Sequence, residues 1–162
     1  NKNLYGMESG KRSKCREKEA SRILEEVRKV FKEDSKKTIG IISFYKKQSD
    51  IISKLAETEL TDEQLQRVSI GTVDAFQGKE FDVVILSTVR SNSIPRLDGN
   101  EKKVFGFLTL KNRLNVAFSR AKKLVITVGD AKMFSDDYAK KYVPGLYEMC
   151  TNITNESYGG RI

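Results

Sequence analysis

The sequence contains no histidine and only two cysteines in 162 residues. Without histidine, this chain cannot carry a histidine-dependent catalytic triad or most kinds of catalytic zinc site. Cys15 and Cys150 lie far apart and lack CxxC spacing, so they indicate neither a metal site nor a redox motif. We expect both to be reduced structural thiols and predict no metal ligands.

Long hydrophobic runs are also absent. No stretch approaches the roughly 18 apolar residues of a membrane-spanning helix, and the N-terminus lacks the apolar core of a signal peptide. We therefore predict a cytoplasmic protein without a membrane partner. Because the chain begins with Asn1 rather than Met, we expect it to be a fragment of a longer protein.

Positive charge is present in excess. The sequence has 30 Lys and Arg against 22 Asp and Glu, which gives a formal net charge of +8. This balance favours polyanionic partners such as nucleic acids, although basic solvated surfaces also occur in proteins that bind none.

The spacing of apolar residues predicts the secondary structure. In residues 17–32 they recur every three or four positions, which is typical of one helix face, whereas residues 38–44 form a short apolar run typical of a buried strand. By the same patterns we expect strands at residues 38–44, 68–73, 81–89 and 124–128, and helices at residues 17–32, 46–57, 110–122 and 131–142. Residues 62–67 are expected to form a short helix or a turn.

This alternation of strands and helices predicts an α/β domain with a mainly parallel sheet covered on both faces. The domain is expected to occupy residues 17–150, between a flexible lead-in at residues 1–16 and a frayed tail at residues 151–162. The polar loop at residues 91–103 is expected to be mobile.

Polar residues follow several of the expected strands. In open parallel sheets, ligands bind beyond the carboxyl ends of the strands. Three polar sets, residues 43–45, 72–80 and 129–130, follow such ends and are therefore expected along one edge of the sheet.

The residues from Asp74 to Glu80 read DAFQGKE and suit phosphate binding. Asp74 is a good helix-capping residue, and Gly78 lies between Gln77 and Lys79, so that backbone and side-chain donors can approach a phosphate closely. Glu80 can accept from a sugar hydroxyl. An ordinary connection with its polar side chains in water explains the same residues equally well.

Two arginines lie on one side of the expected helix at residues 110–122, about two turns apart. The guanidinium groups of Arg113 and Arg120 are suited to phosphate, and an arginine supplied from outside a nucleotide site can stabilise charge during phosphoryl transfer. The alternative is that both pair with carboxylates on a neighbouring element. The buried face of this helix would carry Leu110, Leu114, Ala117, Phe118 and Ala121.

Taken in order, several segments closely resemble motifs IV, V and VI of superfamily 1 helicases. They are IGIISFYKKQ (39–48), TVDAFQGKE (72–80) with VILSTVR (84–90), GFL (106–108), RLNVAFSRA (113–121) and VITVGD (125–130). The resemblance is to the second RecA-like domain of the up-frameshift and senataxin-like branch, and it covers residues 19–142. It implies a three-layer α/β/α domain of the P-loop NTPase type.

The resemblance implies a nucleotide side. Arg120 matches the motif VI arginine and would be the catalytic arginine finger on the γ-phosphate of ATP, which the N-terminal RecA-like domain of the same chain would hold with Mg²⁺. Gln77, Gly78 and Glu80 would face the nucleotide, and Arg113 is a weaker candidate for nucleotide binding.

The resemblance also implies a nucleic-acid side. Thr72, with Ser43 and Tyr45 from motif IV and with Arg90, would contact the sugar-phosphate backbone of single-stranded DNA or RNA. Such contacts tolerate either nucleic acid.

Residues 6–12 imitate a phosphate-binding loop but do not match one. Three residues rather than four separate Gly6 from Gly10, and Arg12 follows Lys11 where Ser or Thr is required. The Asp-Glu magnesium box is absent too, so the fragment alone is expected to be inactive. The resemblance thus implies the C-terminal motor domain of an ATP-dependent helicase or translocase. The alternative is a non-catalytic nucleic-acid-binding or scaffolding module with a degenerate helicase fold.

Overall fold

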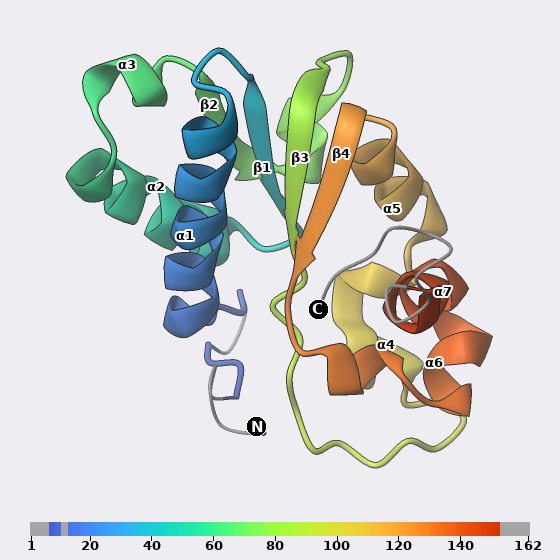
Figure 1. Ribbon diagram of the computed structural model, residues 1–162. Helices are drawn as coiled ribbons and strands as arrows, with labels where there is room; N and C mark the ends of the chain where they lie inside the picture. Colours follow the sequence, from blue (N-terminus) through green and yellow to red (C-terminus); the bar gives the residue numbers. More distant parts are fainter. Residues whose placement is uncertain (1–6, 11–12, 153–162) are drawn as a thin grey trace.

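The computed structural model describes residues 7–10 and 13–152, which form a single sheet flanked by helices (Figure 1). The strands are β1 (Ile39–Ser43), β2 (Val68–Thr72), β3 (Phe81–Ser87) and β4 (Ala121–Val128). Their order is β2-β1-β3-β4, and every neighbouring pair is parallel. The predicted parallel sheet is confirmed.

One face of the sheet is covered by α1 (Glu17–Glu33) and α2 (Lys46–Glu59). Alternate residues of a strand point to opposite faces, and Ile39, Ile41 and Val83 point toward these helices and are fully buried. A short helix, α3 (Asp62–Leu65), joins α2 to β2 and begins with a capping box formed by Thr61 and Gln64.

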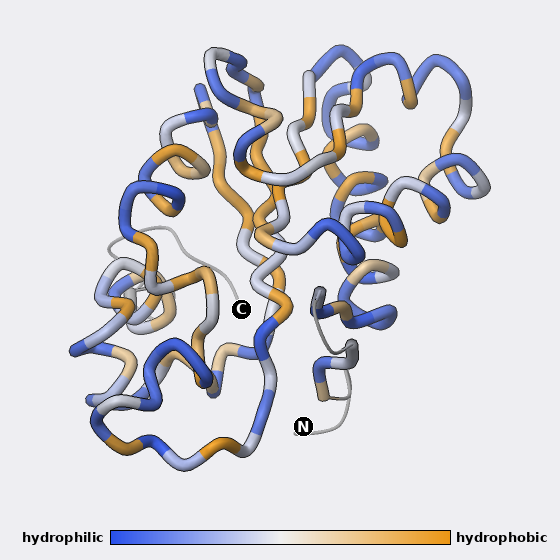
Figure 2. The backbone as a smooth tube through the Cα atoms, turned by 180° about the vertical axis from the view of Figure 1, so that it is seen from behind, coloured by the Kyte–Doolittle hydropathy of each residue, from blue (hydrophilic) through white to orange (hydrophobic). Residues whose placement is uncertain are grey.

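The other face is covered by the second half of the chain. Ile42, Val84 and Leu86 point to this side and are fully buried. The covering elements are η1 (Val73–Phe76), α4 (Glu101–Phe105), η2 (Gly106–Thr109), α5 (Lys111–Phe118), η3 (Ala131–Phe134), α6 (Asp137–Tyr142) and α7 (Pro144–Asn152). Figure 2 shows the hydrophobic strands between the two more polar layers. The predicted three-layer α/β/α architecture is therefore confirmed.

The helix predicted at residues 110–122 is too long at its C-terminal end. α5 stops at Phe118, and β4 begins at Ala121, which pairs with Phe81 of β3. The backbone N–H of Phe81 donates to the carbonyl of Arg120 at 2.9 Å, which draws this part of the chain into the sheet. Leu110 is 44% exposed and Ala121 is in a strand, so neither belongs to a buried helix face.

The helix predicted at residues 131–142 is divided in two. The side chain of Asp136 accepts from the backbone N–H of Ala139 at 2.9 Å and starts α6 after η3. Pro144 then begins α7, because the first turn of a helix tolerates a missing N–H. The sequence patterns did not predict α7 or α4.

The described part of the predicted lead-in packs against the carboxyl edge of the sheet. The carboxylate of Glu8 forms a buried ion pair with Arg90 at 3.1 Å and accepts from the backbone N–H of Ser91 at 2.9 Å. Cys15 is also buried, and Ser9 and Cys15 exchange two backbone hydrogen bonds of 3.0 Å. The proposed domain boundaries at residues 17 and 150 stay predictions.

A second carboxylate, that of Glu19, is fully buried at the same edge of the sheet. It accepts from the Ser87 hydroxyl at 2.6 Å, the Val89 N–H at 2.9 Å and the Arg16 guanidinium at 3.1 Å. Burial raises the pKa of Glu19, and these donors and the Arg16 charge oppose that shift. Glu19 thereby ties α1 to the end of β3, where Val89 has a φ of 64°.

Candidate functional site

The residues predicted to bind ligands lie at two opposite edges of the sheet. Thr72 and Ser43 are the last residues of β2 and β1 and mark the carboxyl edge. Glu80 and Arg120 directly precede β3 and β4 and lie at the amino edge. A strand as long as β3 spans about 20 Å. The prediction that residues 72–80 share one edge is wrong for residues 77–80, because this segment crosses back to start a parallel strand.

Arg120 reaches over the amino edge without a carboxylate partner among the described residues. Its Nε donates to the carbonyl of Val116 at 3.1 Å, its Nη1 to the carbonyl of Lys79 at 3.3 Å, and its Nη2 to the hydroxyl of Ser119 at 2.9 Å. Neutral partners fix the group and leave its charge uncompensated. Among the described residues, Arg120 therefore has no carboxylate partner of the kind that the alternative requires.

The residues beside Arg120 are open to solvent. Gln77, Gly78, Lys79 and Glu80 are all exposed. Gly78 has a φ of 78°, a conformation that favours glycine, and no atom lies within 4 Å of the position that a Cβ would occupy. Within the described part of the chain, Glu80 has one distant, exposed ion pair, with Lys122 at 3.7 Å. These groups are accessible to a ligand.

Arg113 lies apart from Arg120. Its Nη2 pairs with Asp74 at 3.1 Å, and its guanidinium lies 5.5 Å from the centroid of the Phe107 ring. For Arg113, the observed arrangement is thus the alternative in which the arginine pairs with a carboxylate on a neighbouring element. The structure does not bring this residue together with the predicted nucleotide group.

At the carboxyl edge, only part of the predicted nucleic-acid set is accessible. Thr72 is half-buried, and its side chain makes no hydrogen bond within the described part of the chain. Ser43 is fully buried, and its hydroxyl accepts from the backbone N–H of Tyr45 at 3.2 Å. We therefore correct the expectation that Ser43 contacts a sugar-phosphate backbone directly: its hydroxyl is occupied inside the protein.

Arg90 is also occupied inside the protein. Besides its ion pair with Glu8, its Nε donates to the carbonyl of Val104 at 3.0 Å, and its Nη2 donates to the carbonyl of Lys103. Its Nη1 donates to the Tyr45 hydroxyl at 3.4 Å, and burial raises the pKa of that phenol. Arg90 and Tyr45 are each only 4% exposed, so Arg90 positions its neighbours and does not present its charge to solvent.

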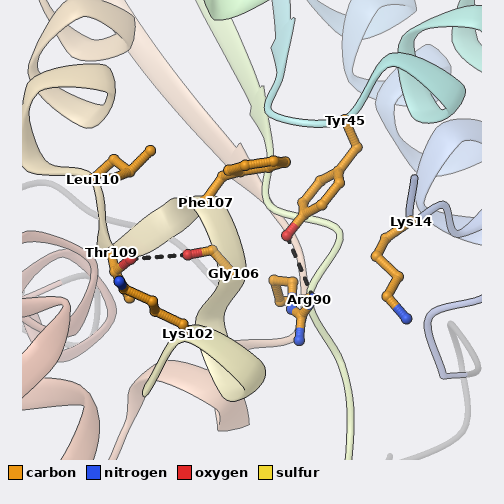
Figure 3. A pocket seen from close by; sticks show the side chains of 8 residues that line it. All are labelled: Lys14, Tyr45, Arg90, Lys102, Gly106, Phe107, Thr109 and Leu110. Atoms are coloured by element: carbon orange, nitrogen blue, oxygen red, sulfur yellow. Dashed lines mark hydrogen bonds between the residues drawn. The ribbon is translucent and has the colours of Figure 1, made fainter. Parts of the chain in front are cut away.

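A surface hollow of about 360 Å³ lies next to these groups and was not predicted (Figure 3). Tyr45 and Arg90 come to it from the ends of β1 and β3, and η2 supplies Phe107. In the sequence, GFL (106–108) stands out only as part of a motif, because nothing in the sequence shows that the ring of Phe107 stays exposed. The lining residues are Lys14, Tyr45, Arg90, Lys102, Gly106, Phe107, Thr109 and Leu110.

The described residues contain neither a metal-binding cluster nor a membrane-spanning helix. No three His, Cys, Asp or Glu side chains gather so that they could hold a metal ion. None of the described helices combines the length and the apolar character that crossing a membrane requires.

Comparisons with known proteins identify the family of this chain. A family model described as an AAA domain matches residues 2–132. The chain is 38% identical over 121 residues to the DNA polymerase alpha-associated DNA helicase A of Saccharomyces cerevisiae. The aligned segment covers 75% of this chain and 16% of the relative. This chain belongs to that AAA domain family and is a superfamily 1 helicase domain of the up-frameshift-like branch.

Further relatives of the helicase domain include an RNA helicase and a regulator of nonsense transcripts. It is 38% identical over 111 residues to the RNA helicase Mov10l1 of Mus musculus, covering 68% of this chain and 9% of that protein. It is 39% identical over 99 residues to the Regulator of nonsense transcripts 1 of Caenorhabditis elegans, covering 60% and 8%. The helicase domain therefore spans only a small part of the length of these relatives.

Proposed function

We propose that this helicase domain is the C-terminal motor domain of an ATP-dependent superfamily 1 helicase or translocase. In this proposal, one edge of its sheet faces a nucleotide held by a partner RecA-like domain and the other edge faces a single nucleic-acid strand. The observation that carries the proposal is the position of Arg120, whose guanidinium lacks a carboxylate partner among the described residues and lies beside exposed motif V groups.

On the nucleotide side, the residues fit an anion supplied from outside the domain. Arg120 would bind the γ-phosphate of ATP, and the exposed Gln77, Gly78 and Glu80 would contact the same nucleotide. The nucleotide and Mg²⁺ supply the phosphoryl-transfer chemistry when bound. The described residues offer no carboxylate cluster for the metal, so its ligands would come from the N-terminal RecA-like domain.

On the nucleic-acid side, the net charge of +8 favours a polyanion. Thr72 would contact the strand directly, and Tyr45 would contribute a further contact with the strand at the same edge. Ser43 and Arg90 would act by positioning these groups, since both are buried. The relatives include both a DNA helicase and an RNA helicase, so the proposal covers single-stranded DNA and single-stranded RNA. An intracellular location is part of the proposal.

ATP hydrolysis by the full-length protein tests this function. We expect the rate to rise when single-stranded DNA or RNA is added, because motor domains close around nucleotide and strand together. Strand binding should weaken as salt increases, because phosphate contacts release counterions. A full-length protein that binds the strand but hydrolyses no ATP would instead be a non-catalytic binding or scaffolding module.

A further inference from the structure

Two exposed apolar side chains line the hollow at the carboxyl edge. Phe107 and Leu110 are each 44% exposed, and both line the hollow of about 360 Å³. Single exposed apolar residues are common on protein surfaces, but a pair that shares one concave site indicates a binding surface. A ligand with an apolar face would cover both.

The ring of Phe107 is held in place from several sides. Its centroid lies 5.4 Å from that of Tyr45, whose hydroxyl is fixed by Arg90 (Figure 3). Gly106 has a φ of 58°, and a Cβ there would lie only 2.2 Å from the Tyr45 hydroxyl oxygen. Glycine is therefore required for this close approach, and it presents the next residue, Phe107, to the hollow in a fixed position.

The surroundings of the ring are positively charged. Among the described residues that line the hollow, the cations are Lys14, Lys102 and the buried Arg90. The carboxylate of Glu8 pairs with Arg90 at 3.1 Å and with Lys14 at 3.7 Å, so Lys102 is the lining cation that has no carboxylate partner among the described residues. The guanidinium of Arg113 lies 5.5 Å from the ring centroid. Lys102 beside an exposed aromatic ring suits a ligand that combines an apolar face with negative charge, as a nucleotide does.

A chain of contacts leads from the hollow toward the segment that holds Thr72, the predicted strand contact. Arg113 links the Phe107 ring to Asp74 through a 3.1 Å ion pair, and Asp74 lies two residues after Thr72. An adjoining hollow of about 380 Å³ shares Thr109 and Leu110 and is lined by Lys111 and Arg113. Basic side chains beside an exposed aromatic ring are the combination that binds single strands.

We propose that this hollow binds one unpaired base of a single-stranded nucleic acid. The base packs on the exposed part of the Phe107 ring, next to the Arg113 guanidinium, and Leu110 forms an apolar wall beside it. Lys14 and Lys102 lie near the flanking phosphates. This inference rests on the proposed function, and it adds a base-stacking subsite to the backbone contacts at the carboxyl edge.

The test measures the affinity of the full-length protein for a single-stranded oligonucleotide and for copies that carry one abasic site at each position in turn. Loss of one stacked base is expected to weaken binding of the wild-type protein by about 5- to 100-fold at one position. Phe107→Ala should lose a similar factor with the intact oligonucleotide and then bind the abasic copies equally well.

Matched variants separate stacking from folding. Phe107→Leu keeps apolar volume but loses the ring and should behave like Phe107→Ala, whereas Phe107→Tyr should bind like the wild type. Leu97→Ala is the control, because Leu97 is 63% exposed but does not line the hollow. Its affinity should stay unchanged.

Two results would overturn the inference. One is that every Phe107 variant binds the intact oligonucleotide as tightly as the wild type does. The other is that the wild-type protein binds every abasic copy as tightly as the intact oligonucleotide, which would show that no single base is held in the hollow. If the proposed function is itself wrong, the wild-type protein fails to bind any single strand, so the two failures are distinguishable.

Discussion

Replacing Arg120 with alanine in the full-length protein is expected to lower nucleic-acid-stimulated ATP hydrolysis by about 10³-fold or more. The guanidinium is fixed by two backbone carbonyls and the Ser119 hydroxyl, yet no carboxylate of the described residues neutralises it. A fixed, uncompensated charge suits the negative charge that develops on a transferring phosphoryl group. The measurement is the steady-state rate at saturating nucleic acid.

Two further variants make this result specific. Arg120→Lys keeps the charge but not the planar fork, so its rate should lie between those of the wild type and Arg120→Ala. Arg28→Ala removes an exposed arginine whose partner is Glu59, on the opposite face of the sheet, and should hydrolyse ATP normally. Single-strand affinity should be retained in all three. Near-normal turnover of Arg120→Ala would contradict the role assigned to this residue.

Replacing Glu19 with alanine is expected to lower the free energy of unfolding by about 3–5 kcal/mol. The change leaves the buried Arg16 without this carboxylate and deprives the Val89 N–H of its acceptor. It also removes a hydrogen bond that holds Val89 at a φ of 64°, a conformation that itself costs about 1–3 kcal/mol and persists because its surroundings fix it. Domains of this kind are stable by only about 5–15 kcal/mol, so the variant should be close to unfolding.

The matched control for Glu19 lies on the same helix. Glu25 pairs with Arg22 at 2.8 Å, but its side chain is 50% exposed. Exposed ion pairs contribute at most about 1 kcal/mol, so Glu25→Ala should change stability little. Urea denaturation of both variants gives the comparison. Equal losses would show that the buried cluster around Glu19 does not stabilise the domain.

The sequence predicts the sheet well because the signals for it are local. The strands predicted at residues 38–44, 68–73 and 81–89 correspond to β1, β2 and β3, and their ends agree with the structure to within two residues. The boundary between α5 and β4 is missed for the opposite reason. Ala121 fits the helical spacing, and only its pairing with Phe81, far away in sequence, places it in a strand.

The candidate site shows the same division between local and non-local information. Motif spacing identifies Thr72 and Arg120, and the structure gives both accessible positions. Motif spacing cannot show that Arg90 is already paired with Glu8, 82 residues earlier in the chain, or that Ser43 is buried. The hollow around Phe107 depends on residues from four separate segments, so no single stretch of sequence contains it.

Photo-crosslinking tests the central claim, that nucleic acid and nucleotide occupy opposite edges of this domain. A single strand carrying thio-substituted bases is bound to the full-length protein and irradiated, and the crosslinked tryptic peptides are identified by mass spectrometry. We expect crosslinks in residues 104–111, which include Phe107, and none in residues 114–120, which include Arg120. Crosslinks concentrated in residues 114–120 would place the strand at the amino edge and contradict this arrangement.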